Sequence, residues 1–77
     1  MSKADEMFKK LEYKISFEDS HYIRYRFVGV FADTEIQFDL KEETIFIESS
    51  LGESQEISMQ ELQAIYEKVK ELGRLDD

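Results

Sequence analysis

The sequence predicts an α+β fold with the element order α-β-β-β-β-α, a two-layer arrangement in which both helices pack on one face of a four-stranded antiparallel meander. Helical periodicity at both ends of the chain and alternation of apolar and polar residues in the middle support this prediction. Both helices need an apolar surface, and a sheet that is apolar on one side provides one. With 77 residues, we expect a single α+β domain over residues 1–77.

The first helix is predicted to begin after Ser2, whose hydroxyl can cap a free backbone N–H group. Asp5 adds an acid at the positive end of this helix. Apolar residues then follow the i, i+3, i+4, i+7 spacing, which lays one stripe along a helix. The residues of the stripe are Ala4, Met7, Phe8 and Leu11.

Four runs with alternating apolar and polar residues predict the strands, at residues 13–17, 23–27, 36–40 and 45–47. We expect them to pair in chain order, with the first and the last run at the edges. The alternation also predicts a register, because a slip by one residue would turn every side chain over. The expected pairs are Ile15 with Tyr25, Phe17 with Ile23, Phe27 with Phe38, Tyr25 with Leu40, Arg26 with Asp39, Phe38 with Ile47 and Leu40 with Ile45, with a tight turn at Ala32 and Asp33.

The second helix is predicted from a capping box at residues 58–61, in which the Ser58 hydroxyl and the Glu61 carboxylate each accept a backbone N–H. Gly73 is expected to end the helix as its C′ residue. The predicted apolar stripe consists of Leu62, Ile65, Tyr66, Val69 and Leu72.

Composition limits the function classes. The net charge is −8, so nucleic acid is an unlikely partner, because its affinity comes mostly from basic residues. The chain has no cysteine, which excludes disulfides, thiolate metal sites and a cysteine nucleophile. It also lacks an apolar run of the roughly 20 residues that a membrane span needs, and an apolar signal segment. We therefore expect a soluble, cytoplasmic protein without a membrane partner.

The sequence offers little for catalysis or for a cofactor. His21 is the only histidine, and we expect it to adopt a left-handed backbone in a hairpin turn rather than to act as a general base. Carboxylates at Asp39, Glu42 and Glu43, or at residues 76–77, lack the order of a calcium loop. We expect no enzymatic activity, no cofactor and no metal.

Three segments resemble small, functionally uncharacterised proteins encoded by phages and prophages of Gram-positive bacteria. They are SKADEMFKKL at residues 2–11, FDLKEETIFI at residues 38–47 and AIYEKVKELG at residues 64–73. Such proteins usually have a Leu-Gly-Tyr turn after the first helix and end in Leu-Gly-Trp-Leu, whereas Glu12 and Arg74 stand here in place of the glycine and the tryptophan. The resemblance implies a phage accessory protein and no particular chemistry.

The candidate partner-binding residues are Tyr22, Arg24, Arg26 and Phe46, which the alternation places together on the open face of the sheet. An aromatic ring next to two arginines can bind a protein or stack on single-stranded nucleic acid. The alternative is a cross-strand ion pair between Arg26 and Asp39 without a binding role.

The prediction for function is a non-enzymatic protein-interaction module, whose partner is another protein or a second copy of the chain in a homodimer. An acidic DNA mimic that inhibits a basic host protein is the main alternative, and binding of single-stranded nucleic acid through residues 22–26 is a weaker one. The acids that the mimic would use gather toward the second helix, at Glu53, Glu56, Glu61, Glu67, Glu71, Asp76 and Asp77.

Overall fold

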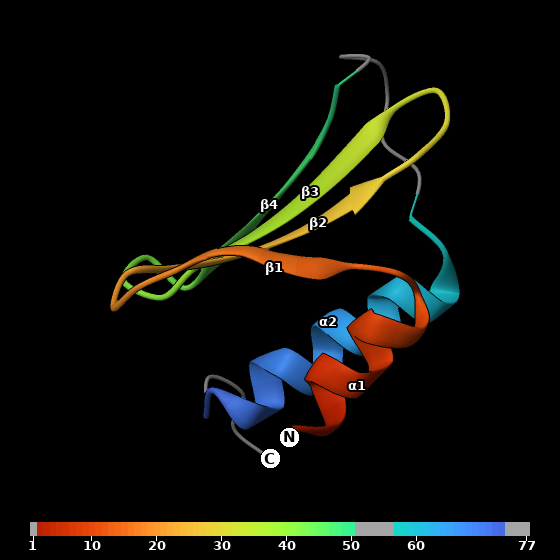
Figure 1. The fold of residues 1–77 in the computed structure, drawn as a ribbon. Helices are drawn as coiled ribbons and strands as arrows, with labels where there is room; N and C mark the ends of the chain where they lie inside the picture. Colours follow the sequence, from red (N-terminus) through yellow and green to blue (C-terminus); the bar gives the residue numbers. More distant parts are fainter. Residues whose placement is uncertain (1, 51–56, 74–77) are drawn as a thin grey trace. The chain divides into compact units, whose positions relative to one another are not determined.

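A computed structural model, which describes residues 2–50 and 57–73, confirms the α+β fold (Figure 1). Four antiparallel strands form one sheet in the order β1-β2-β3-β4, as predicted, with β1 and β4 at the edges. The elements are α1 (Lys3–Lys10), β1 (Lys14–Glu18), β2 (Tyr22–Val28), β3 (Asp33–Asp39), β4 (Thr44–Ser49) and α2 (Met59–Glu71).

The chain divides into two compact units. Of the described residues, a helical unit combines residues 2–12 with residues 57–73, and a sheet unit consists of residues 13–50. The single domain and the packing of both helices on one face of the sheet stay predictions.

In the helical unit, α1 and α2 run antiparallel, so that the start of α1 lies beside the end of α2. Ser2 caps α1 as predicted, since its Oγ accepts from the backbone N of Asp5 at 3.0 Å. The backbone N of Ala4 donates to Glu71 Oε2 at 2.8 Å, and Lys68 Nζ lies 3.4 Å from Asp5 Oδ1. The two helices are therefore joined by polar contacts where their opposite ends meet.

The predicted capping box at the start of α2 is confirmed, and so is Gly73 as the residue that ends this helix. The predicted apolar stripe of α2 is wrong in part. The buried residues of α2 are Ala64, Ile65 and Lys68, whereas Leu62 and Tyr66 are more than half exposed. The small side chain of Ala64 faces inward and the Lys68 ammonium pairs with Asp5 of α1, so the buried side of α2 is rotated from the one that hydropathy predicted.

In the β2–β3 and β3–β4 pairs, the register differs from the prediction by even numbers of residues. Tyr25 pairs with Ile36 rather than with Leu40, a shift of four positions, and Ile47 pairs with Ile36 rather than with Phe38, a shift of two. Arg26 consequently lies opposite Glu35, not Asp39. Because an even shift keeps every side chain on its face, the predicted division of β2, β3 and β4 into two faces is correct.

A β-bulge in β1 overturns one further expected pair. Ile15 pairs with Tyr25 as predicted, but the register shifts between Ile15 and Phe17, so that Phe17 pairs with Arg24 instead of Ile23. The extra residue moves Phe17 to the opposite face of the sheet. The Phe17 ring there lies 5.6 Å from the guanidinium carbon of Arg24.

The turn between β2 and β3 spans residues 29–32, which explains the largest register error. Gly29 N donates to Ala32 O at 3.1 Å, and a Cβ on Gly29 would lie only 2.5 Å from that oxygen. Glycine is therefore required there, and the predicted turn at Ala32 and Asp33 is wrong. Val30 and Phe31, at the tip of the turn, are 93% and 90% exposed.

The other turns are held by side-chain acceptors. Asp19 Oδ1 accepts from the backbone N of both His21 and Tyr22 at 2.8 Å. Among the described non-glycine residues, positive φ occurs at Glu12 and Glu43, so the left-handed backbone expected for His21 is wrong. The Asp19 carboxylate closes this turn without such strain at His21.

Candidate functional site

The four predicted partner-binding residues lie on one face of the sheet, which we call the arginine face. It is the side to which Arg24 and Arg26 point, and the ladder pairs place the other members beside them. Its members are Lys14, Phe17, Tyr22, Arg24, Arg26, Val28, Asp33, Glu35, Gln37, Asp39, Thr44, Phe46 and Glu48. Phe17 is the aromatic member that sequence analysis missed, since only the bulge in β1 brings it there.

One row across the strands has an aromatic ring at each edge. This aromatic row consists of Phe17, Arg24, Gln37 and Phe46, one residue from each strand in turn. Arg24 donates from Nε and Nη2 to Gln37 Oε1, at 3.0 and 2.7 Å. Phe17 is 43% exposed and Phe46 is 59% exposed. Two accessible rings thus lie at the ends of a row whose centre is the hydrogen-bonded pair Arg24 and Gln37.

The neighbouring row is made of charges. This charged row consists of Lys14, Arg26, Glu35 and Glu48, again one from each strand. At its centre Arg26 Nη1 lies 3.1 Å from Glu35 Oε1. On either side like charges are direct neighbours, Lys14 beside Arg26 and Glu35 beside Glu48, which destabilises an antiparallel ladder.

Both arginines are matched by acceptors within the sheet. Arg26 Nη2 lies 2.5 Å from Asp33 Oδ2, and the hydrogen bond to Asp33, together with its charge, raises the pKa of Arg26. Arg24 Nε lies 3.6 Å from Glu35 Oε2. Since phosphate binding needs cations that are not already neutralised, these pairs argue against a nucleic-acid role for residues 22–26.

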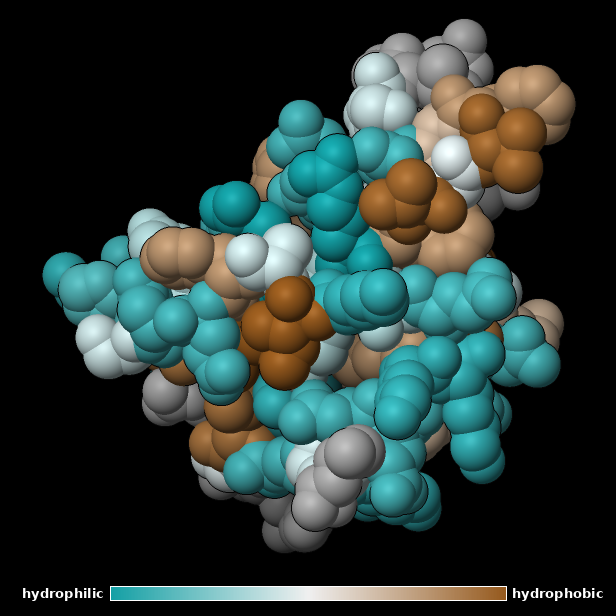
Figure 2. Space-filling model, in the orientation of Figure 1, coloured by the Kyte–Doolittle hydropathy of each residue, from teal (hydrophilic) through white to brown (hydrophobic). Residues whose placement is uncertain are grey.

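The tip of the β2–β3 turn is a second exposed apolar area. Val30 and Phe31 are almost fully exposed, and Val28 at the adjoining end of β2 is 70% exposed. Figure 2 shows hydrophobic side chains together at the upper right, where Figure 1 places this turn. The signal for this turn in the sequence is Gly29, followed by the two apolar residues Val30 and Phe31, whereas the prediction placed the turn at Ala32 and Asp33.

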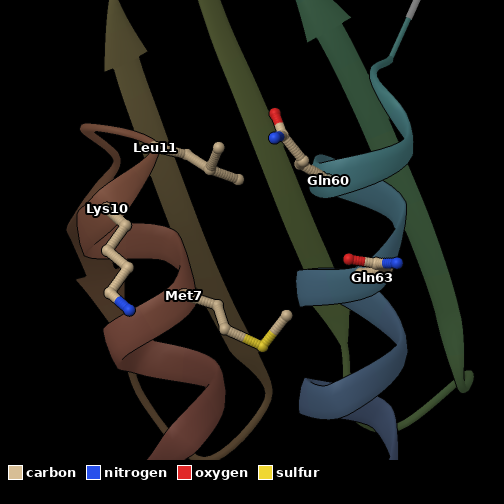
Figure 3. A pocket seen from close by; sticks show the side chains of 5 residues that line it. All are labelled: Met7, Lys10, Leu11, Gln60 and Gln63. Carbon is tan, nitrogen blue, oxygen red and sulfur yellow. The ribbon is translucent and has the colours of Figure 1, made fainter.

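A groove lies between α1 and α2 in the helical unit (Figure 3). Met7 and Leu11 point from the α1 side toward α2, where Gln60 and Gln63 complete the lining. Its volume is about 170 Å³. Small-molecule sites usually measure about 300–1,000 Å³, so this groove is smaller than a usual ligand site.

Among the candidate metal ligands, Asp39 has a local structural role, and Asp76 and Asp77 lie outside the described residues. Asp39 Oδ1 accepts from the backbone N of Lys41 and Glu42, at 3.0 and 2.9 Å. In the described ranges, residues 2–50 and 57–73, no three His, Asp or Glu side chains form a cluster that could hold a metal ion. None of the described helices has the length and hydropathy of a membrane span.

The acids expected to imitate DNA are largely engaged where the structure describes them. Glu61 belongs to the capping box, Glu71 accepts from the backbone N of Ala4, and Glu67 lies within 4 Å of Lys3 and Lys70. The remaining four, Glu53, Glu56, Asp76 and Asp77, lie outside the described residues. The described surface of α2 therefore gives the DNA-mimic hypothesis no support.

Comparison with protein-family models, curated proteins and solved structures found no significant match to this chain.

Proposed function

We propose that this chain is a non-enzymatic protein-interaction module that binds its partner through the arginine face. The observation that carries the proposal is the aromatic row, in which the accessible rings of Phe17 and Phe46 lie on either side of the hydrogen-bonded pair Arg24 and Gln37. Aromatic residues and arginine dominate the binding energy of protein interfaces. The hydrogen bonds from Arg24 to Gln37 hold the guanidinium group in place before binding, which lowers the entropy cost of association.

The proposal includes the setting that the sequence suggests. Resemblance to phage and prophage proteins supports an accessory role in a Gram-positive host, and the absence of cysteine fits the reducing cytoplasm. Arg24 and Arg26 are already paired with acids of the sheet, which favours a protein partner over nucleic acid. Glu71 of α2 already accepts a backbone hydrogen bond, which gives no support to the DNA-mimic alternative with its basic host protein.

A pull-down with a tagged protein tests this function. Nuclease-treated lysate of a Gram-positive host that also expresses the untagged chain is passed over the wild type, the double variant Arg24→Ala/Phe46→Ser and the control Met59→Ser. Met59 is 85% exposed on α2, so its replacement removes a similar apolar side chain far from the arginine face in the sequence. We expect proteins retained by the wild type and by Met59→Ser to be lost with the double variant. Equal retention by all three baits would contradict the proposal.

A further inference from the structure

The arginine face separates its charges by strand. Its basic members, Lys14, Arg24 and Arg26, all lie on β1 and β2. Its acidic members, Asp33, Glu35, Asp39 and Glu48, all lie on β3 and β4. One half of the face is therefore positive and the other half negative, although the whole chain carries a net charge of −8.

We propose that the partner of the arginine face is a second copy of this chain, related by a two-fold axis that runs parallel to the strands between β2 and β3. This inference rests on the proposed function, since it names the partner of the same site. Such an axis turns one face onto the other, so that β1 lies over β4 of the second copy and β2 over β3. Each row then lies over the same row of the other copy in reverse order, as an isologous interface requires.

The charged row is complementary to itself under this rotation. Lys14 comes to lie over Glu48 of the second copy, and Arg26 over Glu35. The neighbouring like charges that destabilise a single sheet thus gain opposite charges from the other chain. A two-fold axis perpendicular to the strands would instead place the positive strands on each other, so the charge pattern selects one dimer.

The aromatic row fits the same axis. Phe17 lies over Phe46 of the second copy at both edges, and Arg24 lies over Gln37 at the centre. Two sheets packed face to face in this way align within about 30°, as in β-sandwiches.

The size of the face predicts a weak dimer. Strands of five to seven residues, with about 3.3 Å per residue and about 4.8 Å between strands, cover roughly 400 Å² per copy. The total of about 800 Å² falls below the roughly 1,200 Å² of stable complexes. We therefore expect a dimer that forms at high protein concentration and dissociates on dilution.

Exchange of charges between chains tests the proposal. Lys14 and Glu48 are on the two edge strands, about 14 Å apart within one sheet, so they meet only between copies. Sedimentation equilibrium at about 0.15 M salt, from about 10 μM to 1 mM protein, measures association of the wild type, of Lys14→Glu, of Glu48→Lys and of their equimolar mixture.

We expect the wild type to approach twice the mass of one chain and each variant alone to associate at least about tenfold more weakly. The mixture should recover wild-type association, because its heterodimer restores both charge contacts. Lys41→Glu and Glu42→Lys, in the turn between β3 and β4, make the same charge changes outside the rows and should associate like the wild type.

Folding of the variants is checked by thermal unfolding of dilute protein. Lys14→Glu puts a carboxylate beside Arg26, and Glu48→Lys puts an ammonium group beside Glu35. Because each change replaces a like-charge neighbour by an opposite one, the unfolding midpoint should stay or rise.

Three results would overturn the dimer: a wild type that stays monomeric up to about 1 mM, equal association of all variants, or a mixture no stronger than its components. A monomeric wild type that still retains a host protein through Arg24 and Phe46 would refute the dimer alone. A monomeric wild type that retains none would refute the proposed function as well.

Discussion

Glu12 holds a backbone conformation that suits glycine. Its φ of 69° lies in the left-handed region directly after Leu11, the C-cap of α1, and its N–H donates to Lys9 O at 2.9 Å. A residue with a Cβ is strained in this conformation by about 1–2 kcal/mol, whereas glycine is not. The turn out of α1 is therefore formed against the preference of its own residue.

Glu12→Gly should raise the free energy of unfolding by about 0.5–1 kcal/mol, because the strain removed exceeds the entropy that glycine adds to the unfolded chain. Urea denaturation measures this gain. Glu12→Ala is the matched control, since it removes the same charge but keeps the Cβ. If both variants gained the same free energy of unfolding, the gain would come from removal of the charge and not from the backbone conformation.

Asp19 links the turn between β1 and β2 to pH. The backbone N–H of Tyr22, and next that of His21, donate to its carboxylate and hold the pKa of Asp19 below its ordinary value of 3.8. Because the folded protein binds this proton more weakly than the unfolded chain does, ionised Asp19 stabilises the fold above that ordinary value. The contribution is lost as the pH falls through the lowered pKa.

We expect the side-chain carboxyl signal of Asp19 to titrate below pH 3.8 in an NMR experiment. The stability difference between the wild type and Asp19→Asn should shrink as the pH is lowered from about 6 to about 2, since the wild-type carboxylate then loses its charge. An NMR midpoint at or above the ordinary value would refute the role given to the two backbone donors.

Among the elements, α1 depends on α2 for part of its N-terminal cap. Ser2 accepts from the backbone N of Asp5, and Glu71 of α2 accepts from the backbone N of Ala4. A helix of this length is marginal by itself, and its first N–H groups need acceptors. The cap from α2 therefore fixes both the start of α1 and its position along the other helix.

Glu71→Ala should lower the free energy of unfolding by about 1 kcal/mol, the usual effect of losing a helix cap. Glu71→Gln keeps an oxygen acceptor at the same place and should lose less. Urea denaturation of both variants measures the difference. An equal loss in the two would mean that the hydrogen bond to Ala4 does not stabilise the helix pair.

The elements were predictable from the sequence because their signals are local. The two capping residues, Ser2 and Ser58, and the change of period at Tyr13 specify helices and strands without knowledge of partners. The register depends on where the turn lies. The turn at Gly29 was not recognised, because the residues that follow it, Val30 and Phe31, are apolar and therefore typical of a strand. The steric requirement at Gly29 involves Ala32 O, which only the folded turn brings near.

The candidate site was predictable for a related reason. Tyr22, Arg24, Arg26 and Phe46 stayed on one face because the register errors were even. Phe17 was missed because the bulge shifts the register by one residue and so moves its side chain to the other face. No residue type in β1 indicates a bulge. The sequence also did not predict that the basic residues of this face lie on β1 and β2 and the acidic ones on β3 and β4, because this depends on which residues lie opposite one another.

For the whole molecule, the two units differ in how the chain builds them. The sheet unit is one continuous stretch whose strands pair with their chain neighbours, so its contacts close short loops. The helical unit joins segments from either side of that stretch. During synthesis, α1 leaves the ribosome long before α2 exists, and for that interval the acceptor on Glu71 is missing. We therefore expect α1, the helix that is synthesised first, to be among the last elements to become stable.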